Sequence, residues 1–174
     1  MSNGSLALNS QTYILDHLTR SGILVTAKVG SKVNPITIGW GTIGIQWGKP
    51  IFIAFVRGCR HTKGMLDKNP EFTVNIPLGE IDPQILTFCG TKSGRDTDKI
   101  AAMRLELEQP EAISVPGIRQ LPLTLECKVI YKQDQDPAAI EPAYDARYYA
   151  KGTANEGDYH TAYYGEVLAA YIIE

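Results

Sequence analysis

The stretch Phe55–Pro77 reads FVRGCRHTKGMLDKNPEFTVNIP, with apolar segments at its two ends and a group of cations between them. This order predicts a strand, a short helix over Thr62–Lys68 that stops at Asn69-Pro70, and a second strand. Thr62 is expected to cap the helix, because its hydroxyl can accept a bond from the first turn. The cations therefore lie at a strand-to-helix turn.

The cations of this turn are Arg57, Arg60, His61 and Lys63. A helix N-terminus presents unpaired N–H groups and a partial positive charge, which stabilise an anion. Arginine adds planar, multidentate donors that suit phosphate. The pattern predicts a phosphate cradle built around Arg57 and Arg60. The alternative is a solvated basic face, and Lys63 fits that alternative better.

The composition indicates one ordinary globular domain over residues 1–174, with 44% apolar residues, 21% charged residues and a net charge of −2. A near-neutral chain disfavours nucleic acid as the main partner. Cys59, Cys89 and Cys127 form no CxxC pair, which disfavours a zinc or thioredoxin-like site, and no carboxylate-rich metal site is evident. No segment is predicted to span a membrane, so a cytoplasmic location is expected.

The rest of the chain is mostly strand-like. Apolar or alternating segments predict strands at Ile23–Val29, Ile36–Ile45, Ile51–Val56, Phe72–Ile76, Leu121–Lys132 and Tyr159–Ile173. Helices are expected at Thr12–Arg20, Asp82–Phe88 and from an Asp96 cap to Met103, whereas Asp134–Tyr144 suggests an exposed connection. Three glycines in Ile36–Ile45 fit either a ligand close to the backbone or a bulge.

This order favours a mainly β protein with short helices, in a closed or nearly closed antiparallel barrel. A doubly wound sheet would need longer helices between parallel strands. The GxGxxG and Walker phosphate motifs are absent from the sequence. The phosphate site must therefore be built in another way.

Four segments together resemble the flavin reductase-like proteins, including flavoredoxin-type members. They are NPITIGWGTIG (Asn34–Gly44), VRGCRHTKGMLDKNPEFTVNIP (Val56–Pro77), CGTKSGRDTDK (Cys89–Lys99) and DYHTAYYGEV (Asp158–Val167). The resemblance implies an FMN-binding split β-barrel with Greek-key-like antiparallel strands. It also implies a homodimer with the flavin pocket at or near the subunit interface.

The resemblance also suggests roles for individual residues. It implies that Asn34 and the strand residues Thr37, Ile38, Gly39 and Trp40 line the flavin ring, that Arg57, Cys59, Arg60, His61 and Thr62 form the phosphate turn, and that Ser93, Gly94 and Lys99 close over the flavin. His160 matches a histidine near the flavin face and is the candidate catalytic residue. A structural histidine is the alternative there, and a helix-surface lysine is the alternative for Lys99.

The phosphate turn departs from the family pattern at Gly58-Cys59, where many relatives carry a serine before the arginine. A thiol donates more weakly than a hydroxyl, although the Cys59 N–H can still serve. His61 can add charge at mildly acidic pH or replace an aromatic ring.

The leading functional hypothesis is an NAD(P)H-dependent FMN oxidoreductase, in which reduced nicotinamide passes hydride to FMN and electrons leave to an acceptor. NADH or NADPH is the possible donor, and a redox partner protein is a possible acceptor. A flavoredoxin-like electron carrier, reduced by a protein donor, needs the same cradle and is the first alternative. The second alternative is a binding protein that keeps the barrel without flavin.

Overall fold

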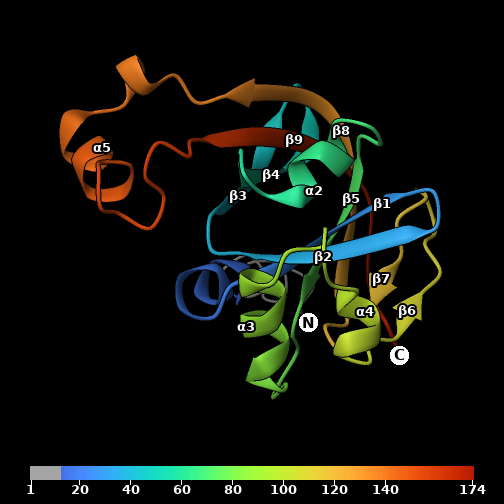
Figure 1. Ribbon diagram of the computed structural model, residues 1–174. Helices are drawn as coiled ribbons and strands as arrows, with labels where there is room; N and C mark the ends of the chain where they lie inside the picture. Colours follow the sequence, from blue (N-terminus) through green and yellow to red (C-terminus); the bar gives the residue numbers. More distant parts are fainter. Residues whose placement is uncertain (1–12) are drawn as a thin grey trace.

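The computed structural model describes residues 13–174 and is dominated by one antiparallel sheet (Figure 1). The sheet contains β1 (Ile23–Val29), β2 (Lys32–Ile38), β3 (Gly41–Gln46), β4 (Lys49–Arg57), β5 (Glu71–Ile76), β8 (Leu123–Asp134) and β9 (His160–Ile172). Its strand order is β2-β1-β5-β8-β9-β4-β3, so β2 and β3 form the two edges and the barrel is split rather than closed. The predicted mainly β, antiparallel fold is confirmed.

The prediction of a single strand at Ile36–Ile45 is wrong, because this segment is divided between β2 and β3. Ile38 is the last residue of β2 to pair with β1, and Gly41 is the first residue of β3 to pair with β4. Gly39 and Trp40 lie between the two ladders without a strand partner. Glycine disfavours continued strand structure, and here it lets the chain pass from one sheet edge to the other. This crossing later forms part of the site.

The core lies on the inner face of the curved sheet. Its main cluster includes the fully buried Phe52, Phe72 and Tyr163. A Cβ at Gly165 would lie 2.5 Å from the Phe72 ring, so β9 needs glycine where that ring crosses it. A second cluster joins Leu24 on β1 to the apolar side of α3 (Pro83–Thr91).

The short helices sit at the ends of strands. The helix over residues 13–20 ends at Gly22, whose φ of +81° suits glycine at this position; Thr12, its expected first residue, lies outside the described part. Asp82 caps α3 through Gln84 N, as expected.

Two expected helix caps are wrong. Helix α2 (His61–Leu66) begins one residue earlier than expected, so Arg60 is at the N-cap and its donor-only guanidinium makes no cap bond. Thr62 lies inside the helix, where its hydroxyl accepts from Asn34. Helix α4 (Lys99–Ala102) is capped by Asp98, whose carboxylate accepts from Ala101 N. Asp96 belongs to a preceding turn, where its N–H donates to Ser93 O.

Residues 135–159 form an arm between β8 and β9, which projects beyond the sheet at the left of Figure 1. The arm carries the short helix η1 (Pro137–Ala139) and the helix α5 (Pro142–Tyr148). The exposed connection expected at Asp134–Tyr144 therefore contains η1 and the beginning of α5.

The remaining strands β6 (Leu107–Glu108) and β7 (Gly117–Ile118) pair in a small separate sheet. Within residues 13–174, no helix has the length and apolar character needed to cross a bilayer.

Candidate functional site

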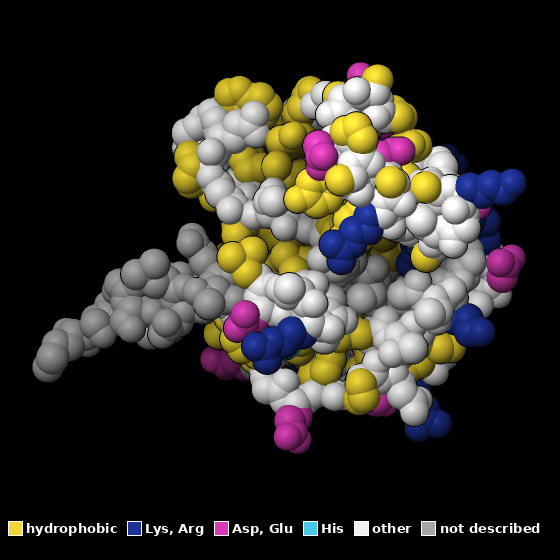
Figure 2. All heavy atoms as spheres, turned by 90° about the vertical axis from the view of Figure 1, so that its left-hand side faces the viewer, with side chains coloured by type: hydrophobic (Ala, Val, Ile, Leu, Met, Phe, Trp, Pro, Cys, Tyr) yellow, Lys and Arg dark blue, Asp and Glu magenta, His cyan; other side chains and the backbone are white. Residues whose placement is uncertain are grey.

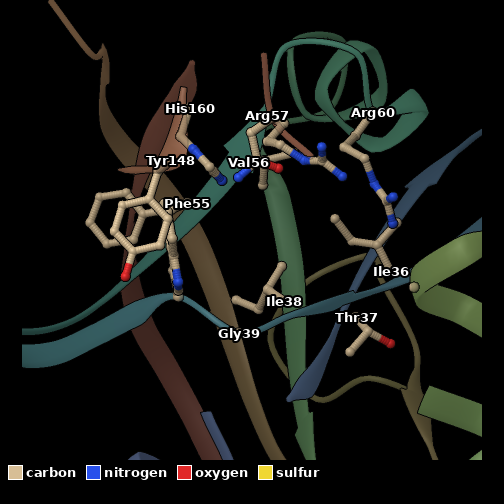
Figure 3. Close-up of a pocket in the computed structure, with 13 residues that line it drawn as sticks. Ile36, Thr37, Ile38, Gly39, Phe55, Val56, Arg57, Arg60, Tyr148 and His160 are labelled. Carbon is tan, nitrogen blue, oxygen red and sulfur yellow. The ribbon is translucent and has the colours of Figure 1, made fainter. Parts of the chain in front are cut away.

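The crossing between β2 and β3 lines a cleft of about 320 Å³, here called the strand cleft. Its walls are Ile36–Trp40, Phe55–Arg57 at the end of β4, and Arg60, Gly90, Tyr148, Asn155 and His160. Figure 3 shows His160 and Tyr148 on one side of this cleft and Ile36 with Arg60 on the other. On the side where the arm projects, the molecule is hollowed and hydrophobic side chains gather in the hollow (Figure 2).

A second hollow of about 290 Å³, here called the basic hollow, adjoins the strand cleft. Its lining residues are Asn34, Ile36, Cys59, Arg60, His61, Thr91, Lys92, Ser93, Gly94, Arg95 and Lys99. Ile36 and Arg60 line both spaces, so the two lie next to each other. An elongated ligand with a flat, largely apolar part and an anionic end matches this pair of spaces.

Lys99 is the most deeply placed cation of the basic hollow, with only 1% of its surface exposed. Its ammonium donates to the carbonyl oxygens of Pro35 and Cys89, both at 2.9 Å. Burial lowers the pKa of Lys99 to about 8, against the opposing effect of Cys89. An ammonium has three donors, and residues 13–174 occupy two of them, which leaves one N–H for an anion in the hollow.

His61 begins α2 and borders the same hollow. Burial, together with Lys32, Arg95, Lys99 and Lys68, lowers its pKa. Its Nε2 atom is buried and has no hydrogen-bond partner within residues 13–174. A buried ring nitrogen without a partner is costly and points to a ligand atom that completes it.

Gly94 packs directly over Asn34. A Cβ at Gly94 would overlap the side-chain oxygen of Asn34, so only glycine fits there. The Asn34 amide is fixed in turn, because Nδ2 donates to the Thr62 hydroxyl at 2.8 Å. The floor of the basic hollow is therefore held by the Asn34 and Thr62 side chains from β2 and α2, with the backbone of Gly94 packed against Asn34.

Arg57 and Arg60 take different positions. Arg57 Nη1 donates to Ala154 O at 3.2 Å and lies 3.7 Å from Asp158 Oδ2, which ties it to the arm. Arg60 lies between the two spaces, and burial, with a smaller effect of Arg57, lowers its pKa. Asp158 also accepts from Cys59 N at 2.9 Å, so that N–H already has a protein partner.

His160 begins β9 opposite Arg57, with 7% of its surface exposed. Burial, reinforced by Arg57 and opposed by Asp158, lowers the pKa of His160 to about 4. Trp40 lies beside the imidazole at a ring distance of 4.7 Å and meets the Tyr148 ring edge-on at 5.1 Å. These aromatic rings form one side of the strand cleft.

The structure brings together nearly all the residues singled out from the sequence. The strand cleft holds Thr37, Ile38, Gly39, Trp40, Arg57, Arg60 and His160, and the basic hollow holds Asn34, Cys59, Arg60, His61, Ser93, Gly94 and Lys99. Thr62 is fully buried behind Asn34 and lines neither space.

Sequence reasoning missed several lining residues. Tyr148 and Asn155 come from the arm, whose place over the cleft has no local signal in the sequence. Arg95 could have been found, because it directly follows Ser93-Gly94 in a segment already singled out. Its guanidinium donates to Cys59 O at 3.1 Å, which ties the loop before α4 to the turn before α2.

A family model described as "Flavin reductase like domain" matches residues 15–174. The chain belongs to this family. The chain is also similar to an uncharacterized protein of Archaeoglobus fulgidus, with 25% identity over 99 residues. That match spans 57% of this chain and only 55% of the relative.

Solved structures support the split-barrel fold of this flavin reductase-like domain. Flavoredoxin from Methanosarcina acetivorans is 24% identical, with a TM-score of 0.64 over 88% of this chain and 69% of that one. Flavoredoxin of Desulfovibrio vulgaris (Miyazaki F) is 21% identical, with a TM-score of 0.65 over the same shares. An NADH:FAD oxidoreductase of Streptomyces globisporus, in complex with NAD and FAD fragments, is 18% identical with a TM-score of 0.63 over 88% and 75%.

Proposed function

We propose that this flavin reductase-like domain binds FMN across the two adjoining spaces and acts as an oxidoreductase with NADH or NADPH as donor. The observation that carries the proposal is that the strand cleft and the basic hollow lie side by side, with Ile36 and Arg60 lining both. One space suits a flat ring and the other suits a phosphate, and FMN joins both groups in one molecule.

The donor set of the basic hollow fits a phosphate. The free donor of Lys99, the partnerless Nε2 of His61 and the Arg60 guanidinium would converge on the anion. Ser93 and Arg95 would add donors from the loop before α4. Cys59 N and Arg57 have protein partners, so their contribution would be smaller than the sequence alone suggests.

The strand cleft fits the ring of the same molecule. Residues 37–40 would line it largely with backbone groups, and Trp40, Tyr148 and His160 would form its apolar wall. Bound FMN would supply the redox chemistry, since its ring accepts one or two electrons. The role of the chain would be to orient the ring, exclude water from one side and leave space for a donor.

The first test is the visible spectrum of the purified protein, alone and after addition of FMN. We expect a yellow protein, or uptake of FMN with a changed flavin spectrum. The second test follows NADH and NADPH oxidation by the FMN-loaded protein with free flavin and ferricyanide as acceptors. Binding without oxidation of either nucleotide would refute the reductase function, and failure to bind any flavin would leave a flavin-free binding protein.

A flavoredoxin-like electron carrier is the second candidate, favoured by the likeness to two flavoredoxin structures. It would bind FMN equally well but receive electrons from a protein. Reduction of the loaded protein by a ferredoxin-type donor, without reaction with NADH or NADPH, would identify this function. A cytoplasmic location remains a prediction.

We further propose a homodimer, as the family resemblance implies. Aromatic side chains on β8, β9 and the β3–β4 turn support this, because Trp47 meets Tyr131 at 6.1 Å and Tyr131 meets Tyr164 at 4.9 Å. Trp47 is 61% exposed and Ile45 is 75% exposed, and apolar side chains of this size favour burial in an interface.

A further inference from the structure

Three hydrogen bonds that involve side-chain atoms link His160 with Tyr149 and Gln135 of the arm. His160 Nδ1 lies 2.8 Å from the Tyr149 hydroxyl, and that hydroxyl lies 2.8 Å from Gln135 Oε1. The backbone N–H of His160 also donates to Gln135 Oε1, at 2.9 Å. His160 and Tyr149 are both buried, with 7% and 5% of their surfaces exposed.

These contacts determine where each proton lies. The backbone N–H of His160 needs an acceptor, so the Gln135 atom that faces it is the carbonyl oxygen and not the amide nitrogen. Tyr149 has one hydroxyl proton, and the carbonyl oxygen can only accept, so this proton points to Gln135. The Tyr149 oxygen must then accept a bond from His160, which requires a proton on Nδ1.

The other ring nitrogen is left as an acceptor. The imidazole extends from β9 into the strand cleft (Figure 3), and no hydrogen bond joins Nε2 to a described residue. A second proton would make the ring a cation, which its burial and the Arg57 guanidinium oppose and Asp158 only partly offsets. At neutral pH, Nε2 of His160 therefore presents a lone pair, and hence a hydrogen-bond acceptor, to a ligand in the cleft.

We propose that Tyr149, oriented by Gln135, is a positioning residue that holds His160 in the Nδ1–H form, so that Nε2 selects a ligand group carrying an N–H or O–H. The tautomer assignment stands on the hydrogen bonds alone. The ligand assignment rests on the proposed function, and it favours an imide N–H of a flavin or a carboxamide N–H of a nicotinamide over a carboxylate or a carbonyl.

The tautomer is measured by two-bond ¹H–¹⁵N correlation spectra of ¹⁵N-histidine-labelled protein at neutral pH. A His160→Asn variant assigns the signals, because the chain has two other histidines, His17 and His61. In the wild-type protein we expect the pattern of a protonated Nδ1 and a bare Nε2 for His160. Detection of Nε2–H, or of a doubly protonated ring, would overturn the proposal.

Variants separate positioning from general packing. Tyr149→Phe removes the acceptor of Nδ1–H, and Gln135→Leu frees the Tyr149 proton to donate to Nδ1, so both should shift His160 to Nε2–H, the form that free imidazole prefers. Gln135→Glu keeps an acceptor and should keep Nδ1–H. Tyr159→Phe is the control, because that hydroxyl donates to Asp145 instead. An unchanged pattern in Tyr149→Phe, or the same shift in Tyr159→Phe, would contradict the proposal.

The ligand assignment is tested with matched probes. FMN is compared with its N3-methyl derivative, and NAD⁺ with nicotinic acid adenine dinucleotide, in which a carboxylate replaces the carboxamide. We expect one N–H-bearing probe to shift the His160 Nε2 resonance, its matched partner to leave it unchanged, and Tyr149→Phe to bind that probe at least fivefold more weakly. If FMN binds by its visible spectrum but neither pair differs at Nε2, this assignment fails; if no flavin binds, the proposed function fails and the tautomer result still holds.

Discussion

The side-chain amide of Asn34 on β2 donates to the hydroxyl of Thr62 in α2 at 2.8 Å, and both residues are buried. This bond joins an edge strand of the sheet to the helix after the cationic turn. It also fixes the Asn34 oxygen that packs beneath Gly94. Two of the segments that line the basic hollow are therefore linked by one hydrogen bond.

Thr62→Val should destabilise the protein and weaken FMN binding, whereas Thr62→Ser should retain both. Valine keeps the shape of threonine but leaves the buried Asn34 N–H without an acceptor, which costs about 1–3 kcal/mol. Urea unfolding followed by circular dichroism measures the free energy of unfolding. Equal stability of the valine and serine variants would show that the bond contributes nothing.

Arg60→Ala should weaken FMN binding more than Arg57→Ala does. Arg60 borders the basic hollow, whereas Arg57 is bonded to the arm, so removal of Arg60 should cost about 1.5–3 kcal/mol for a lost charge-assisted bond. Riboflavin lacks the phosphate, so its affinity should change less in Arg60→Ala. Quenching of flavin fluorescence measures the affinity for each ligand, and Lys128→Ala, at an exposed position, is the control. An equal loss of affinity for riboflavin and FMN would show that Arg60 does not contact the phosphate.

FMN affinity should fall as the pH rises through the region of the Lys99 pKa. Burial lowers this pKa to about 8, so the ligand-free protein loses the Lys99 proton above that pH. A bound phosphate favours the ammonium and raises its pKa, so binding takes up a proton and weakens by at most roughly tenfold per pH unit. Titrations between about pH 7.5 and 9.5 lie above the second phosphate ionisation near 6 and measure this slope.

The pH slope should be absent in Lys99→Met and small for riboflavin. Methionine fills similar space without a titratable group, so its FMN affinity should be weaker than wild type at about pH 7.5 and nearly flat above it. A methionine variant that keeps the full wild-type slope would assign the titration to another group.

Glu126→Gln should lower stability without changing the flavin site. The buried Glu126 carboxylate accepts from the backbone N–H groups of Glu111, Ala112 and Ile113 and from the Tyr171 hydroxyl. A neutral amide turns one acceptor into a donor that faces other donors, and we expect a loss of about 1.5–3 kcal/mol. Thermal and urea unfolding measure it, while the FMN affinity of the folded variant should equal that of wild type.

Trp47→Glu should convert the proposed homodimer into a monomer. The substitution places a charge in the exposed aromatic group that Trp47 forms with Tyr131 and Tyr164. Size-exclusion chromatography with light scattering gives the molar mass. The control is Leu107→Glu on the small separate sheet, where a similar charge should leave the mass unchanged; a wild-type protein that is already monomeric would refute the dimer.

Local sequence patterns predicted most strands because each alternates or concentrates apolar residues over a short range. The patterns failed where the outcome depends on distant parts of the chain. The break at Gly39-Trp40 arises because β2 pairs with β1 whereas β3 pairs with β4. A run of β-forming residues does not indicate which strands its two halves pair with. Thr62 does not cap α2 because the helix begins at His61, and its hydroxyl accepts instead from Asn34, 28 positions away.

The cationic turn was visible in the sequence because Arg57, Arg60 and His61 are close together. Their separation into two spaces was not visible, since it depends on Asp158 and Ala154 of the arm. The burial of Lys99 was also hidden, because its two carbonyl partners come from β2 and α3. The role of Tyr149 was hidden as well, because nothing in the sequence distinguishes it from the other tyrosines among the nine in the chain.

The two ends of the arm meet at the sheet, where Gln135 N donates to His160 O at 2.9 Å and the β8–β9 ladder resumes at Asp134 and Thr161. An excursion that leaves and rejoins a ladder at one point can be exchanged between homologues without altering the register of the strands below it. Because this excursion supplies Tyr148, Asn155 and the partners of His160, a graft of residues 135–159 would transplant the arm's share of the cleft wall and leave Trp40 and His160 in place. Replacement of this insertion, in evolution or by protein engineering, can therefore change which ligand the cleft binds while the sheet is unchanged.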